Sequence, residues 1–456
     1  MYETIAAIST PPMQGGIGMI RISGGEAVRI ASALFRPHSG SALGDADPRR
    51  LVYGKIADRQ GRTLDCAYAV VMPAGSSYTG EDTVEFQCHG SPVLLGEILS
   101  ELYELGALPA RPGEFTKRAF LNGRMDLSQA EAVIDLITAE TADAVHAAAS
   151  QLGGAVGRAI EASYSALCDI IAHFSAAVDF PDEEIEPQSA AEYAERILAV
   201  VDRLVTLGAT FERGRILREG VRCAIIGRPN TGKSSLLNAL AGYDRAMVAS
   251  LPGTTRDTIE ERVHMGGVLL RVCDTAGIRS PADALEQEGV ARAIRAAEDA
   301  ALLLVVLDGS EGALTDDDRI VIDFARGRRA IIVVNKCDLG VTLDTGALEA
   351  AFLHICRVSA LEGAGLEALD ACVRRMFETS AIPFDGSVLT NARHAEAVSR
   401  AASILREACT ALSAGIPPDA VLTLVEEGAG VLGEVTGRSV SEDALARVFE
   451  RFCVGK

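Results

Sequence analysis

The sequence lacks several features that would mark a membrane-bound or secreted protein. No apolar run approaches the roughly 20 residues of a membrane span, and Met1–Thr4 contain no basic region typical of a signal peptide. The ten cysteines are scattered and form no C-x-x-C pair, which argues against a disulfide framework or a zinc site. We therefore expect a cytoplasmic protein with reduced thiols and no membrane contact.

The chain also lacks the basic excess that would attract nucleic acid, because its formal net charge is −20. The acidity is uneven, since residues 125–214 and 380–456 together hold 11 Lys/Arg and 26 Asp/Glu, a net of −15. Two interpretations stay open: the acidity only keeps the protein soluble, or it binds a basic partner surface. Contact with RNA then requires a local patch or a partner.

A length of 456 residues and a 48% hydrophobic composition indicate two to four globular domains. The middle third alternates apolar, strand-like runs with helical patterns. Such runs between helices are typical of a parallel sheet that is covered on both faces, with ligand loops at the carboxyl ends of its strands. The predicted strands are Val221–Ile226, Val268–Cys273, Ala301–Asp308, Ala330–Asn335 and His354–Ser359.

The segments on either side of this middle third, 127–214 and 391–456, are rich in alanine and acidic residues and have helical periodicity. Ser128 to Glu131 have the spacing of a capping box that opens the first helix. The similar composition favours one helical domain interrupted by an inserted domain, and two separate helical domains remain the alternative.

Residues 1–120 differ again, with more Gly, Thr and Val and with short alternating runs at Ala67–Val71 and Thr83–Gln87. We expect a small α+β domain here, with turns at Gly15-Gly16 and Gly24-Gly25.

The most specific motif lies at Gly227–Ser234, which has the G-x-x-x-x-G-K-[ST] spacing of a phosphate-binding P-loop. It follows a predicted strand and opens a helical pattern, as that motif requires. Backbone N–H groups would cradle the phosphates, Lys233 would reach the β- and γ-phosphates, and Ser234 would ligate Mg²⁺.

Later motifs predict that the base is guanine. Asn335-Lys336-Cys337-Asp338 ends a predicted strand, and a carboxylate there can accept hydrogen bonds from the N1–H and N2–H₂ groups of guanine, a donor pair that adenine lacks. Ser359 and Ala360 follow the last predicted strand and should support the base. In Asp274–Gly277, the Asp274 carboxylate can hold the Mg²⁺ shell through water and the Gly277 amide can sense a γ-phosphate. Thr254-Thr255 lie where a switch threonine should complete the Mg²⁺ shell.

Two residues set expectations for hydrolysis. Ile278 follows Asp274–Gly277 and cannot orient water, so the hydrolytic group must come from elsewhere, with Asp283, Glu286 and Glu288 as nearby carboxylates. Asn230 offers a side-chain oxygen that could hold a monovalent cation beside the phosphates, or it is a plain turn residue.

Together these motifs resemble those of the MnmE/TrmE family of tRNA-modification GTPases over essentially the full length. The resemblance rests on Thr10–Gly24, Tyr78–Asp82, Arg111–Gly123, Asp126–Ala132, the GTPase motifs and the terminal Cys453–Lys456. One departure is Met13-Gln14, where the family often has Gly-Arg, so a cation is lost from that loop.

The resemblance implies a multidomain fold. It would comprise an α+β N-terminal domain at 1–122 for tetrahydrofolate binding and dimerisation, and an all-α helical domain at 123–214 and 380–456. An α/β, Ras-like P-loop GTPase domain at 215–379 would split the helical domain. It also implies a homodimer and a heterotetramer with a FAD-dependent partner. Together they would add an aminomethyl or carboxymethylaminomethyl group to C5 of the wobble uridine U34 of certain tRNAs. The one-carbon unit would come from 5-formyl- or 5,10-methylene-tetrahydrofolate.

The resemblance further assigns roles to residues of this chain. Glu286 matches the general base, Ser234 and Thr255 match Mg²⁺ ligands, and Arg21, Glu85, Arg124 and Lys456 match folate contacts. Asn230 and Thr254, with the carbonyl groups of Ala249 and Leu251, match K⁺ ligands. The residues expected to contact GTP are Asn230, Thr231, Gly232, Lys233, Ser234, Ser235, Ala249, Ser250, Leu251, Pro252, Gly253, Thr254, Thr255, Asp274, Thr275, Ala276, Gly277, Asn335, Lys336, Asp338, Ser359 and Ala360.

Two alternatives stay open. Cys453 would be either a nucleophile at the modification centre or a thiol that lines it. The GTPase core also resembles ribosome-assembly GTPases, which are RNA-binding switches that modify nothing; the folate positions and Cys453–Lys456 favour a modification enzyme.

Overall fold

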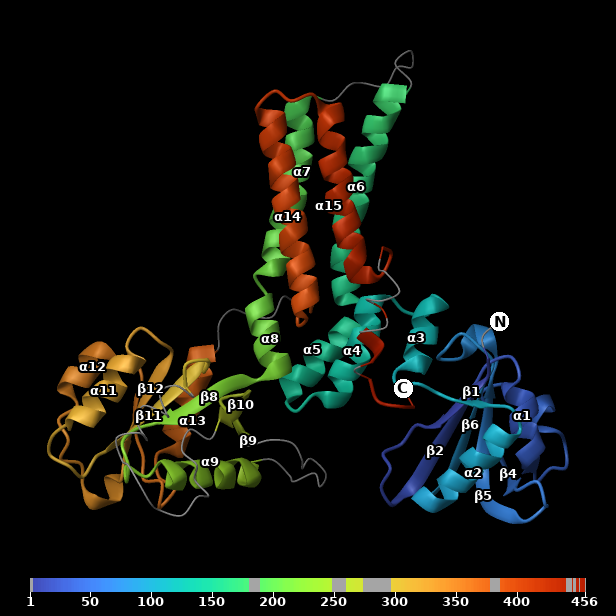
Figure 1. Ribbon diagram of the computed structural model, residues 1–456, viewed down its shortest axis with the longest axis horizontal. Helices are drawn as coiled ribbons and strands as arrows, with labels where there is room; N and C mark the ends of the chain where they lie inside the picture. Colours follow the sequence, from blue (N-terminus) through green and yellow to red (C-terminus); the bar gives the residue numbers. More distant parts are fainter. Residues whose placement is uncertain are drawn as a thin grey trace. The chain divides into compact units, whose positions relative to one another are not determined.

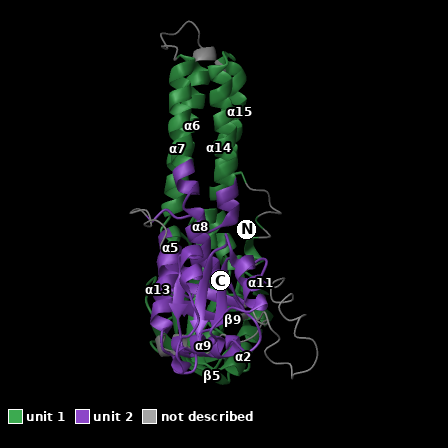
Figure 2. Cartoon of the chain, turned by 90° about the vertical axis from the view of Figure 1, so that its left-hand side faces the viewer, with its two compact units in different colours: residues 1–137, 151–204, 397–456 green, residues 138–150, 205–396 purple. Residues whose placement is uncertain are grey.

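A computed structural model of the protein describes residues 3–179, 189–247, 260–273, 297–377, 386–439, 445, 448–450 and 452–455. The chain divides into two compact units, coloured in Figure 2. The first comprises residues 1–137, 151–204 and 397–456, and the second comprises residues 138–150 and 205–396.

The N-terminal part of the first unit is a seven-stranded sheet with the order β3-β4-β5-β6-β2-β1-β7 (Figure 1). Every neighbouring pair is antiparallel except β1 and β7. The strands are β1 Ile5–Ile8, β2 Gly15–Ser23, β3 Phe35–Pro37, β4 Val52–Ala57, β5 Thr63–Met72, β6 Thr83–Gly90 and β7 Leu108–Pro109. The helices are α1 Ala27–Leu34, η1 Leu43–Asp45, η2 Ala74–Ser76, α2 Pro92–Glu104 and α3 Glu114–Leu121.

This sheet has one apolar face because its side chains alternate with a period of two. Ile20 and Ile22 of β2 are buried with Val84 and Phe86 of β6, in a core that α1 and α2 help to form. The residues between them, Arg21 and Glu85, therefore belong to the opposite face. The predicted strands at Ala67–Val71 and Thr83–Gln87 are confirmed within β5 and β6.

The two predicted glycine turns have different outcomes. Gly24 and Gly25 follow β2 in a turn, and Gly24 has a φ of +136°. The turn predicted at Gly15-Gly16 is wrong, because both residues belong to β2, where the pairing with β6 shifts register between Gly15 and Gly18. A bulge in a continuing strand uses glycine as readily as a turn does, so the sequence pattern did not separate the two.

The rest of the described part of the first unit is mainly helical. α4 Leu127–Thr138, α6 Ala155–Asp179, α7 Ala190–Gly208, α14 Ala392–Ser413 and α15 Pro418–Thr436 belong wholly or mainly to it. Figures 1 and 2 both show α6, α7, α14 and α15 lying side by side, and α6 packs directly on α15. Helices from both sides of the P-loop thus form one bundle. Apolar side chains of all four helices are buried, among them Leu167, Leu204, Leu405 and Leu432.

The capping box predicted at Ser128–Glu131 is wrong by two residues. The Asp126 carboxylate accepts hydrogen bonds from the Gln129 backbone N–H at 2.8 Å and the Ser128 hydroxyl at 2.6 Å. The Gln129 side-chain oxygen in turn accepts from the Asp126 backbone N–H at 3.0 Å. The reciprocal pair that opens α4 is therefore Asp126 with Gln129, a variant that uses Asp and Gln in place of Ser and Glu.

The second unit contains a six-stranded sheet of order β13-β12-β11-β8-β10-β9, parallel except for β9. Its strands are β8 Val221–Ile226, β9 Glu260–Met265, β10 Val268–Cys273, β11 Leu302–Asp308, β12 Ala330–Asn335 and β13 Ile355–Arg357. Its helices are α5 Ala142–Leu152, α8 Phe211–Glu219, α9 Lys233–Met247, α11 Asp316–Ala325, η3 Cys337–Leu339, α12 Gly346–Ala351 and α13 Leu366–Phe377.

Both faces of this sheet are buried, as the apolar runs predicted. Val333 and Leu304 lie in one core cluster, whereas Ile332 and Val305 lie in another on the opposite face. The five predicted strands all exist, although β11 begins at Leu302 and β13 spans only Ile355–Arg357. The prediction missed β9, an antiparallel edge strand with mixed polar and apolar residues. The domain limits after residues 122, 214 and 379 stay a prediction.

Candidate functional site

The P-loop joins β8 to α9 and depends on two glycines. Gly227 has a φ of +156°, and a Cβ there would lie 2.4 Å from the Val306 carbonyl oxygen. Gly232 has a φ of +91°, and a Cβ there would lie 2.2 Å from the Asn335 side-chain nitrogen. A side chain at either position would collide with a neighbouring strand or loop, so the motif's glycines allow the close backbone approach that a phosphate cradle needs.

Inside this loop, side chains hold the backbone in place. The Thr231 hydroxyl and the Lys233 ammonium group both donate to the Arg228 carbonyl oxygen, at 3.0 and 2.8 Å. Burial, with a smaller contribution from the Arg228 charge, lowers the pKa of Lys233. Lys233 is half-buried, and no carboxylate in the described part of the chain pairs with its ammonium group. A phosphate arriving beside it would therefore stabilise its charge, which is the role predicted for Lys233.

The other predicted P-loop contacts are open to solvent. Asn230, Ser234 and Ser235 are exposed. Asn230 has a φ of +64°, the left-handed conformation that Asn tolerates in tight turns. This geometry fits the turn interpretation and leaves the Asn230 side chain accessible, so its assignment to K⁺ stays a prediction.

Arg228 is a site residue that the sequence reasoning missed. Its guanidinium group contacts Glu311 at 2.5 Å and Asp318 at 3.3 Å, although its motif position is unspecified. Asp318 also accepts from the Thr315 hydroxyl at 2.8 Å in the capping box of α11. These contacts anchor the P-loop to α11, and only the tertiary structure brings the partners together.

The predicted guanine loop is tied directly to the P-loop through Asn335. Its side-chain N–H donates to the Thr231 carbonyl at 2.9 Å, and its side-chain oxygen accepts from the Ala360 backbone N–H at 3.0 Å. Asn335 is 2% exposed, so these bonds use polar atoms that water cannot satisfy. Three predicted motifs, the P-loop, the Asn335–Asp338 loop and the Ser359-Ala360 turn, are thereby joined by one side chain.

The carboxylate predicted to select guanine is oriented by its neighbour. Asp338 is exposed, and its carboxylate accepts from the buried Ser359 hydroxyl at 2.6 Å. One carboxylate oxygen is thus held in place while the group stays available at the surface. The prediction was that Ser359 supports the base itself. In the structure its hydroxyl instead orients Asp338, the residue predicted to bind the base.

Lys336 stretches across this loop to Asp308, a second residue that the prediction missed. Their charged atoms lie 2.6 Å apart, and Lys336 has a left-handed backbone with a φ of +62°. Burial opposes ionisation of Asp308, but hydrogen bonds from Lys336 and Ser310 outweigh it and lower its pKa. Asp308 is the last residue of β11, and that position at the carboxyl edge of a parallel sheet was the available signal.

Several predicted residues lie outside the described part of the chain. They are Ala249, Ser250, Leu251, Pro252, Gly253, Thr254, Thr255, Asp274, Thr275, Ala276, Gly277, Ile278, Asp283, Glu286, Glu288 and Lys456. The predictions for the switch segment, the general base and the terminal lysine therefore stay predictions.

In the N-terminal part, Arg21 and Glu85 are register partners on β2 and β6, and their charged atoms lie 2.7 Å apart. Their side chains are only 13% and 14% exposed. The Arg21 guanidinium also lies 5.3 Å from the Tyr78 ring centre and 5.5 Å from that of Phe115. Two of the four predicted folate contacts thus form one partly buried, ring-flanked pair, whereas Arg124 is exposed on the chain after α3.

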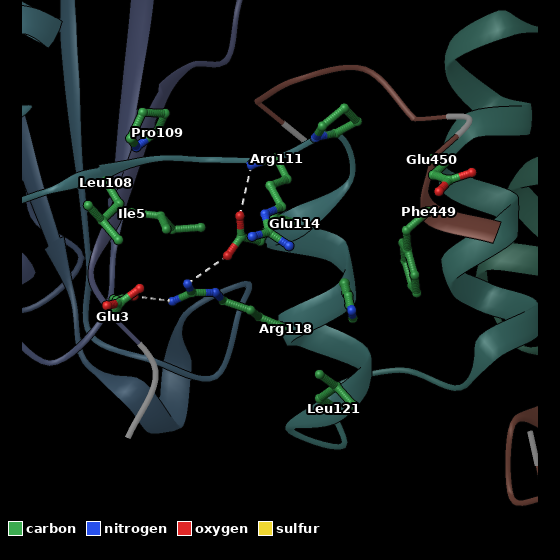
Figure 3. A pocket seen from close by; sticks show the side chains of 12 residues that line it. Glu3, Ile5, Leu108, Pro109, Arg111, Glu114, Arg118, Leu121, Phe449 and Glu450 are labelled. Carbon is green, nitrogen blue, oxygen red and sulfur yellow. Dashed lines mark hydrogen bonds and ion pairs between the residues drawn. The ribbon is translucent and has the colours of Figure 1, made fainter. Parts of the chain in front are cut away.

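A cleft of about 600 Å³ lies beside α3 and is lined by Ile5, Lys117 and Phe449, among others (Figure 3). Arg118 contacts Glu114 at 2.8 Å, the Glu3 carbonyl at 2.8 Å and Glu81 at 3.0 Å. Arg21, Glu85 and Arg124 do not line this cleft. Arg118 belongs to the motif Arg111–Gly123 and had no predicted role, and its contacts are those of a buried structural cation.

The chain's C-terminal segment lies against the N-terminal part of the same unit. The Gly113 backbone N–H donates to the Cys453 carbonyl at 3.3 Å. Gly455 has a φ of +96°, and a Cβ there would lie 2.2 Å from the Ile8 carbonyl oxygen. Cys453 is exposed, and Gly113, which binds its carbonyl, lies two residues before Phe115, the ring beside Arg21.

A P-loop at the carboxyl end of an inner parallel strand, tied to an Asn-Lys-x-Asp loop, defines a P-loop GTPase. In this chain it is inserted in the sequence of a helical domain that follows an α+β domain. The family models "GTP-binding protein TrmE N-terminus" and "MnmE helical domain" match residues 4–124 and 127–453. The chain belongs to the MnmE family of tRNA modification GTPases.

Relatives match over the whole length. The tRNA modification GTPase MnmE of Roseiflexus castenholzii is 43% identical over 100% of both chains, and that of Symbiobacterium thermophilum is 44% identical over 100% of this chain and 99% of its own. Among solved structures, the G domain of the T. maritima FeoB iron transporter is 26% identical over 34% of this chain and 98% of its own. Its TM-score is 0.26. Within the described residues, no helix is both long and apolar enough to span a membrane.

Proposed function

We propose that this chain hydrolyses GTP and, with a FAD-dependent partner, adds an aminomethyl or carboxymethylaminomethyl group to C5 of wobble uridine U34 in certain tRNAs. A tetrahydrofolate derivative supplies the one-carbon unit. The observation that carries the proposal is the coexistence of two sites in one chain. Asn335 ties a guanine loop to the P-loop, and Arg21 pairs with Glu85 in a part that matches the TrmE N-terminal model.

In the nucleotide site, Asp338 selects guanine, because its oriented carboxylate can accept from two donors that only guanine presents. Lys233 contacts the β- and γ-phosphates, and the exposed Ser234 hydroxyl at the start of α9 ligates Mg²⁺ together with Thr255. Bound Mg²⁺ and K⁺ supply positive charge next to the phosphates.

For hydrolysis, Asn230 holds K⁺ together with Thr254 and the carbonyl groups of Ala249 and Leu251. Held there, K⁺ would supply the positive charge that an arginine finger supplies in other GTPases, once two GTPase domains have come together. Glu286 is the general base for the attacking water. A comparison of GTP hydrolysis in K⁺ and Na⁺ tests the first assignment, because equal rates would contradict it. Glu286→Ala should bind GTP and turn it over slowly, so a fully active variant would contradict the second.

In the N-terminal site, the Arg21–Glu85 pair presents a cation and an acceptor on the sheet face opposite the α1/α2 core. The glutamate tail of folate carries carboxylates that suit Arg21 and Arg124, and its pterin edge carries donors that suit Glu85. Lys456 adds a further cation. When bound, the folate supplies a one-carbon unit, and Cys453 acts near it, either as a nucleophile or as a lining thiol.

The proposed assembly is a homodimer formed through the N-terminal domains and joined by the FAD-dependent partner as a heterotetramer. The net charge of −15 in the helical segments supports docking of a basic surface on that partner, which would then carry most contacts with tRNA. Binding between the two proteins should weaken as salt rises, because the Debye length shortens. Affinity that does not change with salt would contradict this arrangement.

The decisive experiment is nucleoside analysis of tRNA from a strain that lacks the gene, with and without complementation by the full chain. We expect the C5 modification of U34 to disappear and to return on complementation. Normal U34 modification in the deletion strain would overturn the proposal. Normal tRNA together with defective ribosome assembly would favour the alternative of an RNA-binding switch.

A further inference from the structure

The strand β9 carries two outward-facing side chains that hold a single residue of the α4–α5 connection. The Arg262 guanidinium donates to the Glu140 carboxylate at 2.7 Å, and Nε2 of His264 lies 3.0 Å from the Glu140 carbonyl oxygen. Since a carbonyl oxygen can only accept, the His264 Nε2 carries the proton. These three residues, here named the Glu140 clasp, join positions 122 and 124 residues apart in sequence.

The opposite face of β9 packs toward the nucleotide site. Val263 and Met265 are buried in the core that contains Leu236 and Leu240 of α9, the helix that begins at Lys233 of the P-loop. The P-loop helix α9 thus packs on one face of β9, and the Glu140 clasp lies on the other. The predicted switch segment, Ala249–Thr255, ends five residues before β9 begins at Glu260.

The turn after β9 is anchored, so the strand cannot shift freely. The Gly266 backbone N–H donates to the Asp370 carboxylate of α13 at 2.6 Å. Gly266 has a φ of +63°, and a Cβ there would lie 2.5 Å from the Arg374 backbone nitrogen. With its turn held on α13, a change at the start of β9 would leave the turn in place and reach the residues that its outer face holds.

The segment that the Glu140 clasp holds links the two compact units. Residues 138–150 belong to the second unit, yet they continue at both ends into the first unit, through α4 and α6. The far end of this segment is also held, because the Ser150 hydroxyl donates to the Gly386 carbonyl at 3.1 Å. A Cβ at Gly386 would lie 2.1 Å from that hydroxyl oxygen.

We infer that Glu140 is a positioning residue that transmits the nucleotide state of the P-loop unit to residues 138–150 and so to the chain of the first unit. Its ion pair with Arg262 is half exposed on the arginine side and 28% exposed on the glutamate side, so it adds little stability. Instead, the pair fixes the position of residues 138–150 relative to β9. The inference rests on the proposed GTP cycle.

The test is hydrogen exchange of α5, Ala142–Leu152, in the full-length chain with GDP or a non-hydrolysable GTP analogue, both with Mg²⁺ and K⁺. We expect α5 amides to exchange at different rates in the two states, and the ratio of rates to fall by about fivefold in Glu140→Gln, a modest coupling between sites. The exchanged-charge pair, Glu140→Arg with Arg262→Glu, should restore most of the ratio.

The matched control is Glu161→Gln, which removes a similar pair with Arg438, also 2.7 Å long and similarly exposed, from the other unit. It should leave the α5 ratio unchanged. GTP affinity and hydrolysis are measured on the same samples. Normal GTP binding with equal α5 exchange in both states, or an effect of Glu161→Gln as large as that of Glu140→Gln, would overturn the inference alone. No GTP binding by the wild-type chain would overturn the proposed function and the inference together.

Discussion

The two sheets of this protein carry their proposed functional residues in different places. In the six-stranded sheet, Lys233, Asp308 and Asp338 lie at or just beyond the carboxyl ends of parallel strands. In the seven-stranded sheet, Arg21 and Glu85 lie within antiparallel strands, opposite each other on one face. The first arrangement uses loops on a buried scaffold, whereas the second uses the sheet surface itself.

The difference follows from the topology of each sheet. Parallel strands are covered on both faces, so only their ends are free to bind a ligand. An antiparallel sheet with one apolar face leaves the alternate side chains of its other face available. We therefore expect substitutions in the N-terminal sheet to affect both stability and ligand binding, and substitutions of exposed residues in the nucleotide loops, such as Asp338, to affect binding alone.

The largest effect should come from Arg21→Met, which leaves the partly buried Glu85 carboxylate without its cation. Breaking such a pair costs about 3 kcal/mol, so urea unfolding of the N-terminal part should shift to lower concentration, and folate binding measured by calorimetry should be lost. GTP hydrolysis should stay normal. The double variant Arg21→Met with Glu85→Leu is the control, and it should recover stability but not folate binding. If Arg21→Met alone left stability unchanged, the two sheets would not differ in how binding and stability are linked.

The next effect should come from Asp338→Asn, which replaces a charged acceptor at the surface. Loss of charge-assisted hydrogen bonds costs about 2 kcal/mol, so GTP affinity should fall about thirtyfold while the unfolding midpoint changes little. Xanthosine triphosphate should bind the variant better than the wild type, since xanthine presents an acceptor where guanine has its amino group. Asp317→Asn, an exposed change in α11, should alter neither value. A fall in the stability of Asp338→Asn together with its GTP affinity would contradict the expectation that this loop residue acts on binding alone.

A smaller effect is expected from Gly455→Ala, which tests whether the C-terminal segment must lie on the N-terminal part. A non-glycine residue with a φ of +96° and a contact 2.2 Å from the Ile8 carbonyl would cost about 1–3 kcal/mol and displace Cys453. Modification of U34 in a complementation assay should fall while GTP hydrolysis persists. Gly430→Ala in α15, where a Cβ has free space, is the matched control. Full modification by Gly455→Ala would mean that the contact is dispensable.

The smallest effect concerns pH and the Lys336–Asp308 pair. The pKa of Asp308 is lowered in the folded chain, so the pair contributes stability above the unfolded pKa of an aspartate, about 3.9, and loses it as pH falls through the folded value. Asp308→Asn should therefore lower stability by about 1 kcal/mol at neutral pH and by less in acid. Unfolding curves at pH 7 and pH 3 provide the measurement. An equal loss at both pH values would assign the effect to packing instead.

The predictions from sequence succeeded where the signal is local. The P-loop, the Asn335–Asp338 loop and the strands before them were all located, because each is a contiguous motif at a strand end. The predictions failed at Gly15-Gly16 and at the start of α4, where one composition is compatible with two local structures. They missed Arg228 and Asp308, whose partners are distant in sequence, and Arg262 with His264, whose strand has no clear apolar pattern.

By itself the sequence determined the family, the nucleotide class and the order of the elements, because these depend on residues within a few positions of one another. Only the tertiary structure decided which residues of the described chain meet. Arg21 pairs with Glu85 across 64 positions, Asn335 reaches Thr231 across 104, and Glu140 meets Arg262 across 122. Such contacts depend on strand register and helix packing, which the pattern of a single segment does not encode.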